Sequence, residues 1–238
     1  MQTLAPTNIE ARIWLGKLYV NSQMPDEALK EVEKIHVRPD LREATRIHRT
    51  DMLFLEASAH LAKRDVGAAE ATVAASLRQY PREENLLATA TQVYLNYGVF
   101  SNALTMIDQQ LTLAPTNVNT LVNKGYVCLQ AGAFEQAIAP LTKALSLETT
   151  NYSALFNRAI AYLRADKLDA AQQDYEVLQK AFPTAFQISY GLAEIAWQKK
   201  DTNAAIRNYE IYLANAPTNT TEAALVNERL KELKPGSP

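Results

Sequence analysis

Three histidines are the residues of this chain best suited to binding a metal, and they recur every twelve residues as His36, His48 and His60. On a helix, twelve residues leave the side chain rotated by about 120°. Ligands must converge on one ion, so this spacing argues against a shared metal site. The chain also lacks the H-E-x-x-H and G-x-S-x-G motifs and a glycine-rich phosphate loop. We therefore expect no catalytic residue, no metal and no cofactor.

A group of three arginines is the second feature that could form a functional site. Arg42, Arg46 and Arg49 follow one another at i, i+4 and i+7, which places them on one face of a helix. Such a stripe could dock an acidic segment of a partner protein. Carboxylates at positions 40, 43 and 51 dilute the charge, so a solvated face is the alternative interpretation.

The composition narrows the class of partner. The formal net charge of −2 provides no basic field for nucleic acid or for an anionic membrane. The sequence contains no run of 18 apolar residues, so we expect no membrane insertion. Cys128 is the only cysteine, which excludes an internal disulfide, and its apolar neighbours place it in a helix-packing core. The compartment stays unknown.

The elements that position these residues follow a fixed period. Pro81, Pro115, Pro183 and Pro217 obey a spacing of 34 residues or its multiples. Six alanines keep the same period after one longer step of 41 residues: Ala28, Ala69, Ala103, Ala137, Ala171 and Ala205. A period of this size indicates stacked copies of one supersecondary unit.

Each period has the pattern of two amphipathic helices. In residues 116–147, Thr116 or Asn117 can cap a first helix, and Gly132 suits the left-handed residue that follows it. A second helix starts at about Phe134 and buries Ala137 and Leu141.

The chain resembles the tetratricopeptide repeat family. Leu15, Gly16 and Tyr19 match part of that family's motif, W-x2-L-G-x2-Y. The small position of the first helix recurs as Gly16, Ala57, Thr91, Gly125, Ala159 and Ala193, and the periodic alanines begin the Ala-x3-large pattern of the second helix. The resemblance implies an all-α fold: an α-solenoid of about six helical hairpins plus a C-terminal capping helix, coiled into a right-handed superhelix.

The phase of the motif assigns residues 1–233 to a single array of repeats. We expect one long, protruding helix from about residue 40 to residue 63, because the seven extra residues add about two turns. Asn219 and Glu222 have the spacing of a capping box, which predicts a capping helix over about 219–233. The expected repeats are 8–39, 40–81, 82–115, 116–149, 150–183 and 184–217, followed by a cap at 218–233 and a tail or linker at 234–238.

The N-terminal residues repeat a string that also occurs in the interior of the chain. Residues 4–8 and 113–117 share the string Leu-Ala-Pro-Thr-Asn, which in the interior closes one repeat and opens the next. We therefore expect an excised segment of a longer protein, with Met1 added at the cut. The first helix is then expected to expose Ile9, Ile13 or Trp14. This predicts self-association there, or capping by the first few residues.

In the family, the first helices line a concave groove that binds peptides, and the phase of this chain assigns the lining. Some members of the family hold a C-terminal carboxylate with a clamp that includes an asparagine, and Asn123 and Asn157 stand at the positions of that asparagine. Their neighbours are apolar, so structural hydrogen bonds are expected there instead. Tyr126, Phe156 and Tyr190 are the expected anchors, with inter-repeat core as the alternative interpretation. The full lining comprises Ile13, Lys17, Phe54, Ser58, Ala88, Gln92, Val122, Tyr126, Phe156, Ile160, Tyr190, Glu194 and Trp197.

The sequence thus predicts a non-catalytic scaffold for protein–protein interaction, which binds an apolar or aromatic segment of a protein or peptide and no nucleic acid. Two alternatives stay open: a self-assembling structural module, and the non-catalytic arm of a larger enzyme or of a secretion or polysaccharide-export protein. The sequence names neither the partner nor the host.

Overall fold

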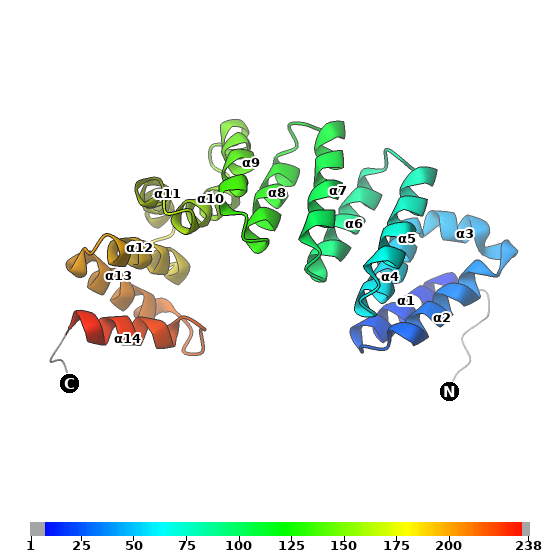
Figure 1. Cartoon of the computed structure of the whole chain (residues 1–238), viewed down its shortest axis with the longest axis horizontal. Helices are drawn as coiled ribbons and strands as arrows, with labels where there is room; N and C mark the ends of the chain where they lie inside the picture. The colour runs from blue at the N-terminus through cyan, green and yellow to red at the C-terminus, as the bar shows by residue number, and fades with distance from the viewer. Residues whose placement is uncertain (1–7, 235–238) are drawn as a thin grey trace. The chain divides into compact units, whose positions relative to one another are not determined.

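The computed structural model describes residues 8–234, apart from the side chain of Arg42. Within that range the regular elements are fourteen α-helices and one short 3₁₀ helix (Figure 1). None of the helices in the described range is long and apolar enough to span a bilayer. Two compact units divide the chain: an N-terminal unit, residues 1–115, and a C-terminal unit, residues 116–238. Both units are all-α, as expected.

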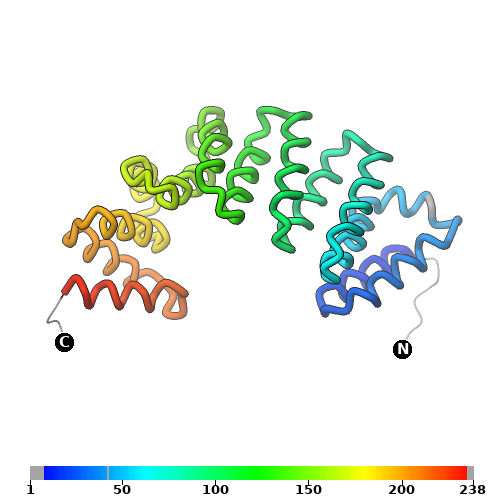
Figure 2. Tube along the Cα trace, viewed as in Figure 1, coloured from blue at the N-terminus to red at the C-terminus, as the bar shows by residue number. Residues whose placement is uncertain are grey.

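The N-terminal unit is built from antiparallel helical hairpins joined by short turns (Figure 2). The hairpins are α1–α2, α4–α5 and α6–α7, and a 3₁₀ turn with a short helix is inserted between the first two. The helix bounds are α1 Ile9–Asn21, α2 Pro25–His36, the 3₁₀ turn Pro39–Leu41, α3 Arg42–Ile47, α4 Arg49–Ala62, α5 Val66–Gln79, α6 Glu84–Asn96 and α7 Phe100–Leu113.

The C-terminal unit repeats the same hairpin three times and ends on a single helix. Its hairpins are α8–α9, α10–α11 and α12–α13, with α14 packed against α13. The helix bounds are α8 Val118–Gln130, α9 Phe134–Leu147, α10 Tyr152–Arg164, α11 Leu168–Ala181, α12 Phe186–Gln198, α13 Thr202–Asn215 and α14 Ala223–Leu233.

The periodic alanines lie in the core of the hairpins. All six are completely buried, which confirms the expected packing role. The small positions of the first helices are buried too, and the glycines among them are in close contact with a neighbour. A Cβ atom at Gly125 would lie 2.3 Å from Cγ of Leu141 on α9, and one at Gly16 would lie 2.6 Å from Cδ2 of Leu55 on α4. Small residues at these positions therefore set the spacing between helices.

Every hairpin turn ends its first helix in the same way. We number the six residues of each turn from one to six. The N–H of the sixth residue bonds the carbonyl of the first, and the N–H of the fifth bonds the carbonyl of the second, as in the Schellman motif. In the turn after α8, Ala133 bonds Cys128 and Gly132 bonds Leu129 in this way. The fifth residue has positive φ in all six hairpins. Gly132 was expected in this role and is confirmed at φ +72°. The six left-handed residues are Gln23, Arg64, Gly98, Gly132, Asp166 and Lys200.

Replacing Lys200 by glycine is expected to stabilise the chain by about 0.5–1 kcal/mol. A side chain in the left-handed region costs about 1–2 kcal/mol, whereas glycine adopts it without that cost. The reciprocal change at the equivalent position, Gly132→Ala, is expected to destabilise by a similar amount. Urea unfolding of both variants measures the two effects, and shifts of the same sign would contradict the assignment.

The expected long helix over residues 40–63 is wrong. The segment begins as a 3₁₀ turn, continues as α3 and breaks at His48, whose φ and ψ are −94° and 25°. The carbonyl of Arg46, which an unbroken helix would bond to the N–H of Thr50, instead accepts a 2.8 Å bond from Nη1 of Arg49. Oγ1 of Thr45 also bonds the carbonyl of Leu41 at 2.9 Å, a contact that bends helices.

The expected helix caps are confirmed only in part. Asn117 caps α8, since its Oδ1 accepts the N–H of Thr120 at 3.1 Å, as one of the two expected candidates. The expected Asn219 cap is wrong, because α14 begins at Ala223 and no side chain caps it. Most of the repeated string at residues 4–8 and most of the tail at 234–238 lie outside the described residues.

Of the three alternatives for an exposed apolar residue on the first helix, the structure selects Trp14. Ile9 and Ile13 are buried in a cluster with Val32 and Leu55. Trp14 is 67% exposed, as expected, and Leu18, one turn further along α1, is 44% exposed. The exposed apolar face of α1 is therefore the pair Trp14 and Leu18.

Candidate binding surfaces

The C-terminal unit contains a cavity of about 210 Å³ that is lined mainly by aromatic and apolar side chains. We call it the aromatic pocket. Its walls come from the first helices α10 and α12, with contributions from α11, α13 and the segment before α14. The lining residues are Phe156, Ile160, Leu163, Arg164, Tyr175, Phe186, Gln187, Tyr190, Tyr212 and Glu222.

Helical spacing explains why these side chains meet. Phe156 and Ile160 lie one turn apart on α10, and Phe186 and Tyr190 lie one turn apart on α12. Tyr212 makes an edge contact with the ring of Phe186 and a tilted contact with the ring of Tyr190, with ring centroids 6.0 and 5.5 Å apart, respectively. These contacts fix the orientation of the aromatic walls.

The two tyrosines Tyr175 and Tyr190 of the aromatic pocket are uncharged near pH 7. Burial raises the pKa of Tyr190 to about 12, with a smaller contribution from the nearby Glu194 carboxylate. Burial also raises the pKa of Tyr175, whose ring packs edge-on against Phe156 at 6.1 Å. Both phenols therefore stay protonated and can donate a hydrogen bond.

The other residues expected to line a groove in the C-terminal unit lie elsewhere. Val122 is half-buried and Tyr126 is 41% exposed on α8, and neither lines the aromatic pocket. Glu194 and Trp197 contact Arg229 of α14, whose guanidinium lies 4.9 Å from the Trp197 ring centroid and bonds Glu194. These two residues therefore hold the last helix.

Arg229 is the centre of a partly buried network. It donates a 2.6 Å hydrogen bond to Oη of Tyr209, which in turn donates to Oε1 of Glu194 at 2.8 Å. Burial lowers the pKa of Arg229, but the bonds to Glu194 and Tyr209 outweigh it and the net pKa is raised. The network thus joins α12, α13 and α14 through charged hydrogen bonds.

In the N-terminal unit the predicted groove residues differ in exposure. Ile13 and Ser58 are almost fully buried and offer no area to a partner. Lys17 bonds Asp51 at 2.6 Å and lies 5.4 Å from the ring of Phe54. Ala88 and Gln92 are exposed on α6, and Gln92 bonds Asn96.

Asn123 and Asn157 also differ from the expectation. Asn123 is exposed and Asn157 is half-buried. Among the described residues no side-chain hydrogen bond holds either asparagine, so their expected structural role is wrong.

Sequence reasoning missed the contribution of the second helices. It assigned the groove to first helices alone, whereas Tyr175 of α11 and Tyr212 of α13 supply two of the aromatic walls. The Ala-x3-large pattern places Tyr175 four residues after Ala171 and does not indicate that it reaches a cavity. The excess of tyrosine in the last two hairpins was the available signal.

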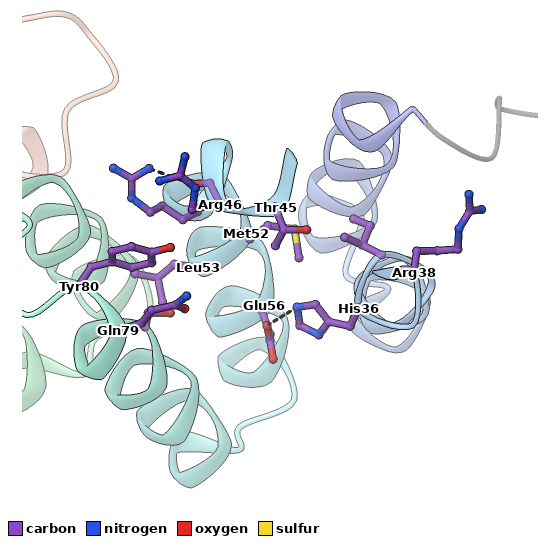
Figure 3. Close-up of a pocket in the computed structure, with 12 residues that line it drawn as sticks. His36, Arg38, Thr45, Arg46, Met52, Leu53, Glu56, Gln79 and Tyr80 are labelled. Atoms are coloured by element: carbon purple, nitrogen blue, oxygen red, sulfur yellow. Dashed lines mark hydrogen bonds and ion pairs between the residues drawn. The ribbon is translucent and has the colours of Figure 1, made fainter. Parts of the chain in front are cut away.

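The N-terminal unit contains a larger cavity, of about 340 Å³, between the ends of α2 and α5 and over α4 (Figure 3). We call it the basic pocket. In Figure 3, Tyr80 and Gln79 lie on one side and His36 on the other, and Arg38 points away from the rest. The lining residues are Ile35, His36, Arg38, Thr45, Arg46, Arg49, Met52, Leu53, Glu56, Ser76, Gln79 and Tyr80.

Arg46 and Arg49 belong to this pocket, although the helix expected to align them is broken. Arg46 bonds Glu43 and lowers the pKa of that carboxyl. Arg49 bonds Oε2 of Glu83 at 2.5 Å and lies 5.1 Å from the ring of Tyr80. The side chain of Arg42 is not among those that the structure describes, so only Arg46 and Arg49 of the expected stripe are placed.

The three histidines lie apart. His36 is 3.8 Å from Glu56, and His48 lies within 4 Å of Glu10 and Asp51. Within residues 8–234, no group of three or more His, Cys, Asp or Glu side chains is arranged to hold a metal ion. Cys128 is buried on α8, as expected.

A family model described as "Tetratricopeptide repeat" matches residues 156–220, which span α10 to α13 and most of the aromatic pocket. Solved structures extend the likeness. A tetratricopeptide repeat protein from Parabacteroides merdae has 15% identity and a TM-score of 0.67, over 94% of this chain and 86% of that one. No curated protein sequence matches the chain.

Two further solved structures have similar folds. YrrB, described as a TPR protein with an unusual peptide-binding site, has 16% identity and a TM-score of 0.60, over 80% of this chain and 96% of its own. PilW, described as a widely conserved type IV pilus biogenesis factor, has 18% identity and a TM-score of 0.60, over 77% and 85%. At these identities the likeness shows the fold, that of the α-solenoid class.

Proposed function

We propose that this tetratricopeptide-repeat chain is a non-catalytic scaffold that binds a segment of a partner protein, with one apolar side chain of that segment in the aromatic pocket. The observation that carries the proposal is the lining of the pocket. Seven apolar or aromatic side chains and three polar ones surround a cavity of about 210 Å³.

The size of the cavity favours a single side chain as its occupant. Sites for whole cofactors or drug-sized ligands commonly measure about 300–1,000 Å³. Burying one leucine or phenylalanine side chain contributes about 1.5–3 kcal/mol. Arg164, Gln187 and Glu222 lie among the apolar walls and can bond the backbone of the incoming segment.

The fold supports a peptide as the ligand. YrrB, which has this fold, is described as having an unusual peptide-binding site. The family match over residues 156–220 covers the helices that build the aromatic pocket. We therefore place the main contact of the partner in the C-terminal unit.

Substitutions in the pocket are expected to weaken peptide binding. Peptides are first selected from a random library on the intact chain, and their affinities are then measured by fluorescence anisotropy. Ile160→Ala and Tyr190→Ala are each expected to weaken binding by about 10- to 30-fold, because they remove central apolar contacts. Thermal melting of each variant separates loss of binding from loss of folding.

Tyr126→Ala is the matched control, since Tyr126 is an exposed aromatic residue on a first helix outside the pocket. It is expected to leave the affinity unchanged. Equal losses in all three variants, or no loss at Ile160 and Tyr190, would remove the aromatic pocket from the proposal.

Self-association is the second candidate, and it is favoured by the exposed pair Trp14 and Leu18 on α1. Light scattering over a concentration series distinguishes it: a mass that rises with concentration and returns to the monomer value in Trp14→Ser supports assembly through α1.

A further inference from the structure

The basic pocket is unusual among the grooves of this chain because of its charge. His36 and three arginines line it, and Glu56 is its one acidic residue among the described side chains. The corresponding groove of the C-terminal unit lies over α12 between α11 and α13. Its lining has equal numbers of acidic and basic residues, namely Glu176 and Asp201, and Lys199 and Arg207. The excess of arginines in the lining is therefore a particular property of the basic pocket and not of the repeat. Arg38, Arg46 and Arg49 each pair with a carboxylate outside the lining, at Asp40, Glu43 and Glu83 respectively.

The charge comes from the segment that breaks the repeat period. Arg38, Thr45, Arg46 and Arg49 lie in the stretch from the end of α2 to the start of α4, where the alanine spacing is 41 residues and not 34. The break at His48 turns the start of α4 so that Arg49 reaches the backbone of Arg46. The inserted residues thus place two guanidinium groups at one edge of the groove.

These two guanidinium groups are held in place but retain bonding capacity. Arg49 is fixed by Glu83, by the carbonyl of Arg46 and by the ring of Tyr80. Arg46 uses Nε and Nη2 to bond Glu43. Each guanidinium carries five N–H donors. Among the described residues, Nη1 of Arg46 and Nη2 of Arg49 make no hydrogen bond.

The two charges also repel each other. The hydrogen bond with Glu83 raises the pKa of Arg49, whereas the charge of Arg46 acts in the opposite direction. An anion placed between the two groups would offset this repulsion and accept the remaining N–H bonds.

We propose that the basic pocket binds a carboxylate side chain of an acidic segment in a protein partner, with Arg46 and Arg49 donating the hydrogen bonds to the carboxylate. This rests on the proposed function, in that the ligand is a protein segment, but it names a second contact in the N-terminal unit. A protein carboxylate fits better than a free inorganic anion because the lining is mixed. Met52 and Leu53 form an apolar floor, and Ser76 and Gln79 can bond a peptide backbone.

The test uses a blocked, fluorescein-labelled peptide of alternating glutamate and serine with a central leucine. Its binding to the intact chain is measured by anisotropy and by the NMR signals of the arginine Nε–Hε groups. Arg46→Gln is expected to weaken binding about tenfold, and added salt is expected to weaken it further. Because Arg46 is exposed and pairs only within α3, this variant is expected to fold normally.

Arg207→Gln is the matched control, since Arg207 lines the corresponding groove of the C-terminal unit. It is expected to bind the peptide as the unchanged chain does. Equal weakening by Arg207→Gln, no weakening by Arg46→Gln, or equal binding of a peptide with glutamine for glutamate would each overturn the proposal. So would inorganic phosphate, if it shifted the arginine signals as strongly as the peptide at equal concentration.

The proposals for the aromatic pocket and the basic pocket can be tested independently of each other. Tyr190→Ala is expected to leave binding of the acidic peptide unchanged, because the aromatic pocket belongs to the other unit. Loss of the acidic peptide in Arg46→Gln with intact binding of library-selected apolar peptides supports two distinct contacts.

Discussion

Ala137→Leu is expected to lower the free energy of unfolding by about 1–3 kcal/mol. Ala137 has no exposed surface and lies one turn before Leu141, whose Cγ would be 2.3 Å from a Cβ on Gly125. The helices α8 and α9 are already in contact there, so three further carbon atoms must displace a helix or a side chain. Urea unfolding measures the change.

The matched control is Ala139→Leu, the same substitution two residues further along α9. Ala139 is exposed, so its leucine projects into solvent and is expected to change stability by less than about 0.5 kcal/mol. Ala171→Leu, at the equivalent buried position of the next hairpin, is expected to behave as Ala137→Leu does. Equal stabilities of the buried and exposed variants would contradict the packing role of the periodic alanines.

Arg229→Ala is expected to destabilise the C-terminal unit by about 2–3 kcal/mol. The substitution removes the bonds to Glu194 and Tyr209 and the contact with the Trp197 ring. It also leaves the carboxylate of Glu194, whose side chain is 13% exposed, without its cation. Thermal unfolding followed by circular dichroism measures the loss.

Two comparisons separate this network from general effects of charge. Lys231→Ala removes an exposed cation from the same helix and is expected to be nearly neutral. Adding Glu194→Gln to Arg229→Ala is expected to recover part of the loss, since it removes the uncompensated charge. If the double variant is less stable than Arg229→Ala, the penalty does not come from the isolated carboxylate.

The period of the small residues was enough to predict the hairpins. Ala28 and Ala205 are both completely buried although they lie at opposite ends of the array, because the same close approach recurs in each hairpin. The left-handed turn was predicted at Gly132, where the residue type reveals it. At Lys200 and Arg64 the same geometry could not be predicted from residue type, because there the tertiary packing of the hairpin overrides local preference.

The errors occur where the period fails or the array ends. The seven inserted residues were compatible with a continuous helix by periodicity alone. At His48 the helix breaks and the guanidinium of Arg49 bonds the carbonyl of Arg46, a contact that helical phase does not encode. Asn219 has the right spacing for a cap, yet α14 starts four residues later.

The candidate sites were predicted less well than the fold. The phase of the repeat motif identified three residues that line one cavity together, Phe156, Ile160 and Tyr190. It did not identify Tyr212, because a residue on a second helix reaches that cavity only through the packing of three helices. It also assigned Ser58 to a surface, whereas α4 buries it. Periodicity places a residue on a face of a helix, and tertiary packing decides whether that face is exposed.

Nuclear Overhauser effects between a library-selected peptide and the intact chain test most directly whether the partner binds in the aromatic pocket. We expect contacts between an apolar side chain of the peptide and the rings of Phe156 and Tyr190, with none to the ring of Tyr126. Contacts confined to α8, or a bound peptide with no contact to α10 and α12, would contradict it.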